Sequence, residues 1–331
     1  MGEVWAAEDT AGAREVAIKV LLPRAALKPD LVRRFEREAR AVAAVQSPFV
    51  CQLLGFERDR KSGAHLLVFE RLKGESLSER LRRELYLPFA EVGTILDDVW
   101  QGLGAAHAAG IIHRDLKPGN IFLERRPDPA RPERAKVLDF GISKLTKKDP
   151  LDAAEPSLTD FDATLGSFAY MAPEQIRGAA RVDERADIYA LGAVAFRALS
   201  GRLPFEGSSS GMIMALKIDR PAPTLSEVTD EQWPIGIERF LAKALQRDRE
   251  LRFASAAEAL AEWRAIQPLA ASMAQRAPRP RPSLPIDDHA PERTAVDGPP
   301  TMTEVSRPSP WDDESHTEID GGHEPPKEKE G

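Results

Sequence analysis

Three features that would each point to a different class of protein are scarce in this sequence. It contains one cysteine, Cys51, so no disulfide can form within the chain and we expect a reducing compartment. No run approaches the ~20 apolar residues of a membrane span, and the N-terminus lacks the charged and then apolar pattern of a signal peptide. The formal net charge of −7 gives no basic surface for nucleic acid. We therefore expect a cytoplasmic protein without a membrane span or a nucleic-acid partner.

The remaining composition is that of a globular protein. The chain has 331 residues, 42% of them hydrophobic and 30% charged, so it can bury a large core in one domain or two. Cys51 lies in the apolar run Phe49–Leu54, where no neighbouring residue supplies a base. A packed side chain is therefore expected there rather than a reactive thiol.

The octapeptide His113–Asn120 is the most informative stretch of the chain. It lies between Ile111–Ile112 and Ile121–Leu123, which indicates a polar loop held between two buried anchors. The tripeptide Asp139–Gly141 begins 19 positions after Asn120. Phosphoryl transfer needs a carboxylate that orients a hydroxyl group and two oxygen ligands for magnesium, and this arrangement supplies them.

The octapeptide resembles the H-R-D-L-K-P-x-N motif, and the tripeptide the D-F-G motif, of the eukaryotic-type serine/threonine protein kinases found in bacteria. The resemblance implies an α+β, two-lobed protein kinase fold. A small β-rich N-lobe, with its first strand missing, would span residues 1–70, and a larger, mainly helical C-lobe residues 71–266. ATP and Mg²⁺, or Mn²⁺ in its place, would bind in the cleft between the lobes.

The resemblance also implies a role for each polar residue of these motifs. Asp115 would accept or orient the proton of the incoming hydroxyl group, and Lys117 would contact the transferring phosphate, as in the serine/threonine version of the loop. Asn120 and Asp139 would hold the magnesium ions. Arg114 would pair with a phosphothreonine of the activation segment.

The N-terminus resembles only the end of the kinase glycine-rich loop, G-x-G-x-x-G-x-V. Gly2 and Val4 match the last glycine and the valine, which would contact ATP, but the first two glycines and the strand before them are absent. Those glycines let backbone amides close over the phosphates. Either the true start codon lies upstream, which we favour, or the protein has half of this lid.

Two strands are predicted next, over Glu3–Glu8 and Glu15–Leu22. The second contains V-A-I-K, whose Lys19 lies among apolar residues and so either extends to solvent or has a buried anionic partner. The resemblance implies that Lys19 binds the phosphates of ATP.

Apolar residues recur along one face of Asp30–Gln46 and predict a helix. In the family a glutamate of this helix pairs with the strand lysine and positions it for the α- and β-phosphates. Glu36 and Glu38 are both candidates. Context and spacing favour Glu38, whereas a charged surface position accounts for Glu36.

A further strand pair is predicted over Val50–Glu57 and Ala64–Glu70. By resemblance the hinge between the lobes follows, with the backbone around Glu70 and Leu72 meeting the adenine edge. Phe69 would limit the adenine pocket, although its position is equally compatible with core packing.

The C-lobe is expected to begin with two helices. Ser76 and Glu79 form a capping-box pattern at the start of the first. A long helix over Phe89–Ala109, ended by Gly110, leads to the octapeptide. The charged stretch 124–134 is predicted to be a solvated loop of more than usual length.

The activation segment runs from Asp139 to Glu174 and has 36 residues. It is polar and acidic, so we expect disorder before phosphorylation. Thr164 and Thr159 are the predicted phosphosites, with Ser157 a lesser candidate.

Three residues match structural positions of the family. Glu174, in A-P-E, would form a buried pair with Arg252. Asp187, at the start of an apolar helix, would brace the backbone of the catalytic loop.

The composition changes at the end of the chain. From Pro268 onward there are 13 acidic and 7 basic residues, so this tail carries −6 of the net charge of −7. It has too few large apolar residues to offset the entropy of ordering, and we predict disorder over residues 267–331. The tail could bind phosphopeptide-recognising partners, or it could be a solubilising linker. The residues that would carry phosphate are Thr294, Thr301, Thr303 and Ser309.

The sequence thus predicts a kinase that phosphorylates Ser and Thr of proteins, including itself. The alternative is a kinase-fold scaffold with little activity, because the front of the glycine loop is missing. The complete set of polar motif residues argues against that alternative. A kinase-like enzyme acting on small molecules is disfavoured, because A-P-E with its Ser- and Thr-containing activation segment is a feature of kinases with protein substrates.

Overall fold

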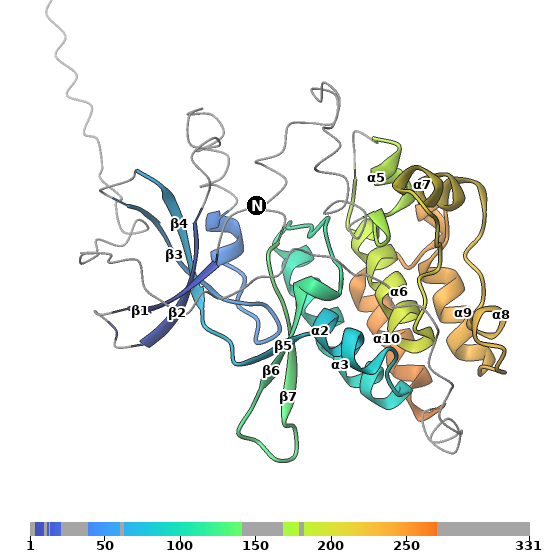
Figure 1. Ribbon diagram of the computed structural model, residues 1–331, viewed down its shortest axis with the longest axis horizontal. Helices are drawn as coiled ribbons and strands as arrows, with labels where there is room; N and C mark the ends of the chain where they lie inside the picture. Colours follow the sequence, from blue (N-terminus) through green and yellow to red (C-terminus); the bar gives the residue numbers. More distant parts are fainter. Residues whose placement is uncertain are drawn as a thin grey trace, which may run out of the picture.

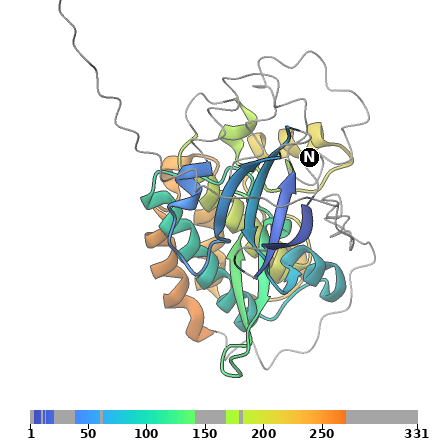
Figure 2. The same ribbon diagram turned by 90° about the vertical axis from the view of Figure 1, so that its left-hand side faces the viewer.

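The computed structural model describes residues 4–9, 12, 14–20, 39–59, 63–140, 168–178 and 182–269. A four-stranded sheet lies on one side of the molecule, and a helical region with a small three-stranded sheet lies on the other (Figure 1). Figure 2 views the molecule from the side of the four-stranded sheet, with the helices behind it. This is the two-lobed α+β arrangement expected from the sequence.

The four-stranded sheet forms the N-lobe. Its strands are β1 (Val4–Asp9), β2 (Arg14–Val20), β3 (Leu53–Arg58) and β4 (His65–Glu70). They are antiparallel in the order β1-β2-β4-β3. Because β2 is an inner strand, Lys19 is flanked by Val4 on β1 and by Leu67 on β4. The sheet thus holds the predicted phosphate-binding lysine directly beside the valine of the glycine-loop remnant.

The strand predicted from Val50 begins three residues later, at Leu53. Val50 forms a parallel bridge with Val137 instead, and the Cys51 N–H donates to the Val137 carbonyl at 2.9 Å. Strand pairing with the C-lobe therefore replaces pairing within the N-lobe at these two residues. Cys51 is buried, as expected.

The helix predicted over Asp30–Gln46 also differs in extent. Its described part is residues 39–43. The Val45 N–H donates to the Val42 carbonyl at 3.1 Å, and this three-residue bond closes the last turn. The helix thus ends before Gln46.

The small sheet corrects the prediction of a loop over residues 124–134. Its strands are β5 (Gly74–Ser76), β6 (Ile121–Arg125) and β7 (Glu133–Val137), in the order β5-β6-β7. Glu124 pairs with Arg134 and Arg125 with Glu133, so opposite charges face each other across the ladder. The charged stretch is therefore compatible with strands, and the β6–β7 hairpin extends from the lower edge of the molecule (Figure 1).

The C-lobe is built around α6 (Arg185–Ser200), in which every residue from Ala186 to Ser200 is buried. A helix buried on all sides lies at the centre of a domain. Gly192 lets α9 approach closely, because a Cβ atom there would lie 2.8 Å from that of Ala244. The other α-helices described are α2 (Leu77–Glu84), α3 (Phe89–Ala108), α5 (Pro173–Ile176), α7 (Ser210–Asp219), α8 (Leu225–Thr229), α9 (Ile235–Ala244) and α10 (Ala256–Ile266).

The first two helices follow the sequence signals. The capping box is confirmed: the Glu79 N–H donates to the Ser76 hydroxyl at 3.2 Å, and the Ser76 N–H donates to the Glu79 carboxylate at 2.6 Å. Helix α3 ends at Ala108, one residue before the prediction, and Gly110 follows with φ of 73°. That left-handed conformation is one that glycine adopts without strain.

The folded domain reaches further than expected. Residues Gln267–Leu269 form the 3₁₀ turn η6, and Leu269 packs against the core. The Trp263 indole N–H donates to the Gly93 carbonyl at 3.1 Å and so fixes α10 on α3. The prediction of a tail from residue 267 is therefore wrong by at least three residues, and residues 270–331 lie outside the described part. Among the described helices, none has the length and hydropathy needed to cross a bilayer.

Candidate active site

The octapeptide His113–Asn120 is held in place by one buried carboxylate. Asp187, at the start of α6, is 1% exposed. Its Oδ2 accepts the His113 N–H and its Oδ1 the Arg114 N–H, both at 2.8 Å, and the His107 Nε2–H donates to Oδ2 at 2.9 Å. Burial alone would raise the pKa of Asp187, but the hydrogen bonds from His107 and the His113 backbone hold that pKa below its usual value. The bracing role expected for Asp187 therefore has a direct geometric basis.

This support is needed because the loop is strained. Arg114 has φ of 62° and Asp139 φ of 52°, in the left-handed region that non-glycine residues rarely adopt. Such strain costs about 1–3 kcal/mol per residue and persists only where surrounding contacts fix it. Arg114 itself is exposed to solvent.

The polar groups of the loop converge on Asp115. Lys117 Nζ lies 3.2 Å from Asp115 Oδ2, with side-chain exposures of 12% and 18%. The Asn120 Nδ2–H donates to the Asp115 carbonyl at 2.7 Å, and its contact with Asp115 Oδ2 is 3.5 Å. The first of these bonds fixes the orientation of the Asn120 amide. A carboxylate, an ammonium group and an amide are thus gathered in one partly buried cluster.

The N-lobe contributes a second charged contact. Lys19 Nζ, from β2, lies 3.1 Å from Asp139 Oδ1, and the two side chains are 12% and 13% exposed. An ammonium group and a carboxylate from opposite lobes therefore meet at a site with limited access to water. Hard oxygen donors beside a cation are the set that a metal–phosphate complex requires.

His113 joins the two motifs, a role that the sequence reading did not assign. Its Nε2–H donates to the Leu138 carbonyl at 2.8 Å, and its Nδ1 accepts the Asp115 N–H at 3.2 Å. Its ring lies 5.0 Å from that of Phe140, which is buried. The Leu138 N–H in turn donates to the Asn120 carbonyl at 2.8 Å. These contacts fix the position of Asp139 relative to Asp115.

The match to known proteins agrees with this geometry. Residues 1–265 match the family described as "Protein kinase domain". The chain belongs to the protein kinase family. Serine/threonine-protein kinase pkn2 of Myxococcus xanthus is 39% identical over 266 residues, which are 78% of this chain and 30% of that protein. Pkn1 of the same organism is 37% identical over 309 residues, 90% of this chain and 42% of that one. The chain thus spans less than half the length of these two relatives.

Solved protein kinases share the fold. The kinase domain of PknI from Mycobacterium tuberculosis aligns with a TM-score of 0.59 at 27% identity, covering 80% of this chain and 91% of that one. A structure of Rad53 1-466 in complex with AMP-PNP aligns with a TM-score of 0.60 at 25% identity, covering 79% and 61%.

The kinase hinge contains an ion pair that sequence reasoning missed. Lys136 Nζ on β7 lies 2.7 Å from Glu70 Oε1, and the same oxygen accepts the Gln52 N–H at 2.8 Å. These contacts tie the end of β4 to the C-lobe. Phe69 is buried, and Leu72 is half-buried and packs against the core.

The expected pair behind the A-P-E segment is present. Arg252 binds Glu174 with two hydrogen bonds of 2.7 and 2.8 Å, and its guanidinium lies 4.9 Å from the Tyr189 ring centre.

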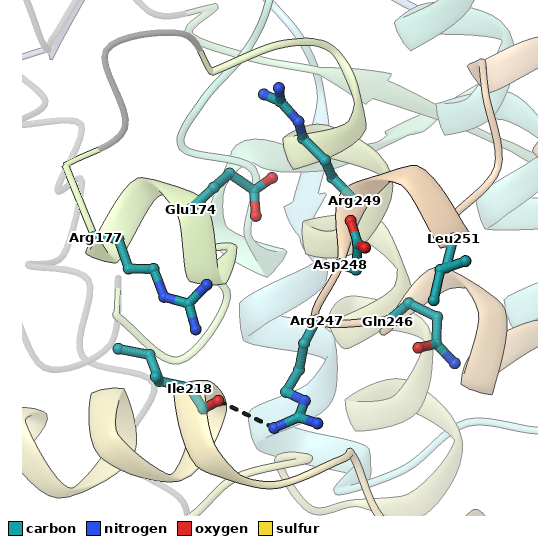
Figure 3. Close-up of a pocket in the computed structure, with 8 residues that line it drawn as sticks. All are labelled: Glu174, Arg177, Ile218, Gln246, Arg247, Asp248, Arg249 and Leu251. Carbon is teal, nitrogen blue, oxygen red and sulfur yellow. Dashed lines mark hydrogen bonds between the residues drawn. The ribbon is translucent and has the colours of Figure 1, made fainter.

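A cavity of about 470 Å³ lies beside this pair, between α5, the end of α7 and the turn before α10 (Figure 3). It lies outside the catalytic cluster. Ten candidate residues fall outside the described part of the chain: Gly2, Glu36, Glu38, Ser157, Thr159, Thr164, Thr294, Thr301, Thr303 and Ser309.

Proposed function

We propose that this chain is a serine/threonine protein kinase that transfers the γ-phosphate of ATP to Ser and Thr hydroxyl groups of proteins, itself included. One observation carries the proposal. The Lys19–Asp139 contact between the lobes and the Asp115–Lys117–Asn120 cluster are held together by the His113 and Asp187 contacts. These side chains are the hydroxyl-orienting, phosphate-binding and metal-binding groups that phosphoryl transfer uses.

The Asp115 carboxylate would orient the acceptor hydroxyl and receive its proton. Lys117, 3.2 Å from that carboxylate, would neutralise the charge of the transferring phosphoryl group. A lysine at this position favours Ser and Thr acceptors over Tyr, by resemblance to the serine/threonine version of the loop.

ATP and Mg²⁺, with Mn²⁺ as a substitute, fit the residues present. Lys19 would bind the phosphates, positioned by Glu38, while Asn120 and Asp139 supply the oxygen ligands that magnesium prefers. Magnesium would neutralise the phosphate charge during transfer. The backbone around Glu70 and Leu72 would meet adenine, and Gly2 and Val4 would lie over the phosphates. The fold neighbour in complex with AMP-PNP supports a nucleotide site of this kind.

Regulation would follow the pattern of the family. Phosphate on Thr164 or Thr159 would pair with Arg114 and order the activation segment. Protein substrates, the chain itself and phosphopeptide-recognising proteins that bind the tail are the proposed partners.

The test is the intact mass of the 1–331 chain after incubation with Mg·ATP, beside the Asp139→Ala variant. We expect mass gains in steps of one phosphate in the wild type and none in the variant. The measurement is repeated on a chain extended before Met1 by a designed strand and the two missing glycines of the G-x-G-x-x-G-x-V pattern. Absence of phosphate from both chains would overturn the proposal in favour of a kinase-fold scaffold.

A further inference from the structure

Lys217 on α7 is a buried lysine that the proposed chemistry does not use. It is 1% exposed, and its Nζ donates to the backbone carbonyls of Ala169 at 2.6 Å and Met171 at 2.8 Å. Within the described ranges no carboxylate pairs with it. Its other close neighbour is the ring of Tyr189, 5.2 Å from Nζ. Lysine is almost never fully buried without a charged partner.

The position is costly to the folded state. Burial lowers the pKa of Lys217 to about 7 from its usual 10.5. The Tyr189 ring also contacts Arg252, another cation, whose guanidinium is paired with Glu174. A methionine of similar length would fill the same volume without a charge to desolvate. Stability alone therefore does not explain a lysine here, and its two hydrogen bonds are the feature that a methionine would lose.

Those hydrogen bonds act on the segment 168–172, which lies beside the catalytic loop. The Ala172 N–H donates to Gln175 Oε1 at 3.0 Å, and the Gln175 Nε2–H donates to the Arg114 carbonyl at 2.9 Å. Arg114 directly precedes Asp115. The segment is therefore linked through Gln175 to the loop that would receive the acceptor hydroxyl.

Helix α7 offers a fixed support for this contact. The Ser209 hydroxyl caps its start by accepting the Met212 N–H at 3.2 Å. At its end the Arg247 guanidinium donates to the carbonyls of Ile218 at 3.2 Å and Asp219 at 2.9 Å, and Figure 3 shows the first of these bonds. Both ends of the helix that carries Lys217 are thus held in place.

We infer that Lys217 is a positioning residue for the protein substrate. By holding the Ala169 and Met171 carbonyls, it fixes the shape of segment 168–172. Because Gln175 links that segment to Arg114, next to Asp115, the polypeptide around the acceptor hydroxyl would lie against it. The inference rests on the proposed kinase function. It predicts that loss of the ammonium group weakens the binding of peptide while leaving the ATP site intact.

The experiment compares the wild-type chain with Lys217→Met, using a serine peptide that the wild type phosphorylates. We expect the KM for peptide to rise about tenfold or more, the effect of losing hydrogen bonds from a charged donor. The KM for ATP and the rate of ATP hydrolysis without peptide should stay within about twofold of the wild type. Lys243→Met is the matched control, because Lys243 pairs with Glu258, is partly exposed and, among the described residues, forms no hydrogen bond or ion pair with segment 168–172; it should change no kinetic constant.

A second variant, Arg247→Met, removes the exposed guanidinium that holds the end of α7. It should raise the peptide KM in the same direction but by less. An unchanged peptide KM in Lys217→Met would overturn the inference. Equal changes in the KM for peptide, the KM for ATP and kcat, in proportion to a lowered melting temperature, would overturn it as well. A wild-type chain that phosphorylates no peptide, even when extended before Met1, would overturn the proposed function and this inference together. An active wild type with an unaffected variant would overturn the inference alone.

Discussion

Two segments flank the candidate site, and a buried charge holds each of them. Asp187 accepts two backbone N–H groups of the catalytic loop, and Lys217 donates to two backbone carbonyls of segment 168–172. Each side chain is 1% exposed. The two anchors nevertheless differ, because Asp187 also receives a hydrogen bond from His107, whereas no carboxylate in the described part of the chain pairs with Lys217.

The difference appears in the two pKa values. The pKa of Asp187 stays below its usual value, despite burial, because donors surround the carboxylate. Burial lowers the pKa of Lys217 to about 7, and among the described residues no carboxylate offsets the lost hydration. The loop that would carry out the chemistry is therefore held by a permanent charge, and the segment that would contact substrate by a charge that changes near neutral pH.

The largest effect is expected from removing the permanent charge. Asp187→Ala leaves the N–H groups of His113 and Arg114 without their buried acceptor and removes the support for the strained Arg114. Loss of one partner from a buried charged contact costs about 3–5 kcal/mol, and kcat should fall about 100-fold. Urea denaturation and steady-state kinetics measure the two effects.

Glu184→Gln is the matched control for this change. Glu184 directly precedes α6, its side chain is 36% exposed, and its carboxylate lies 3.8 Å from His107 Nδ1. Its replacement should change the free energy of unfolding by less than about 0.5 kcal/mol. Wild-type stability and kcat in Asp187→Ala would show that the loop keeps its shape without this anchor.

Replacing Lys217 should have an intermediate effect on the free energy of unfolding, and this effect should depend on pH. The unfolded chain keeps its proton on Lys217 up to pH near 10.5, whereas the folded chain releases it near 7. Between these values the unfolded state binds more protons, so the free energy of unfolding rises with pH. The free energy of unfolding of the wild type, minus that of Lys217→Met, should rise by up to about 1.4 kcal/mol per pH unit from pH 7 to 9, and this difference should be constant below pH 6.

Urea denaturation of both proteins at each pH measures this advantage. Asp187 adds no slope in that window, because a carboxyl group with a lowered pKa loses its contribution only as the pH falls below its usual 3.8. A difference between the two proteins that stays constant from pH 6 to 9 would mean that Lys217 keeps one protonation state throughout.

The features that could be predicted from the sequence are those encoded in short, continuous motifs. The capping box lies within four residues, and the catalytic loop and D-F-G motif are near-continuous strings, so their residue types alone indicate their positions. Asp187 and Arg252 were found because each lies in a family motif. The structure brings these residues to the partners expected for them.

Contacts between distant, unremarkable residues could not be read in the same way. Lys217 lies in an ordinary helical sequence, and its burial depends on segment 168–172, which is nearly 50 positions earlier. Lys136 binds Glu70 across the two lobes, 66 positions apart. The β6–β7 hairpin was mistaken for a loop because its charges suggested solvent, although they pair across the strands. In each case tertiary pairing decided the structure, and residue type gave no signal.

The smallest expected effect comes from the helix cap at Ser76, and it serves as a reference for the effects of replacing Asp187 and Lys217. Ser76→Ala removes the hydroxyl that accepts the Glu79 N–H and so one half of the capping box of α2. The free energy of unfolding should fall by about 1 kcal/mol, with no change in either KM, because the capping-box hydrogen bonds join Ser76 to Glu79 and involve no residue of the two segments. Ser208→Ala, at an exposed hydroxyl before α7, should leave stability unchanged. Lys217→Met is expected to raise the peptide KM. If Ser76→Ala raised it as well, the increase would reflect a general loss of stability. Lys217 could then not be distinguished from a residue that only stabilises the fold.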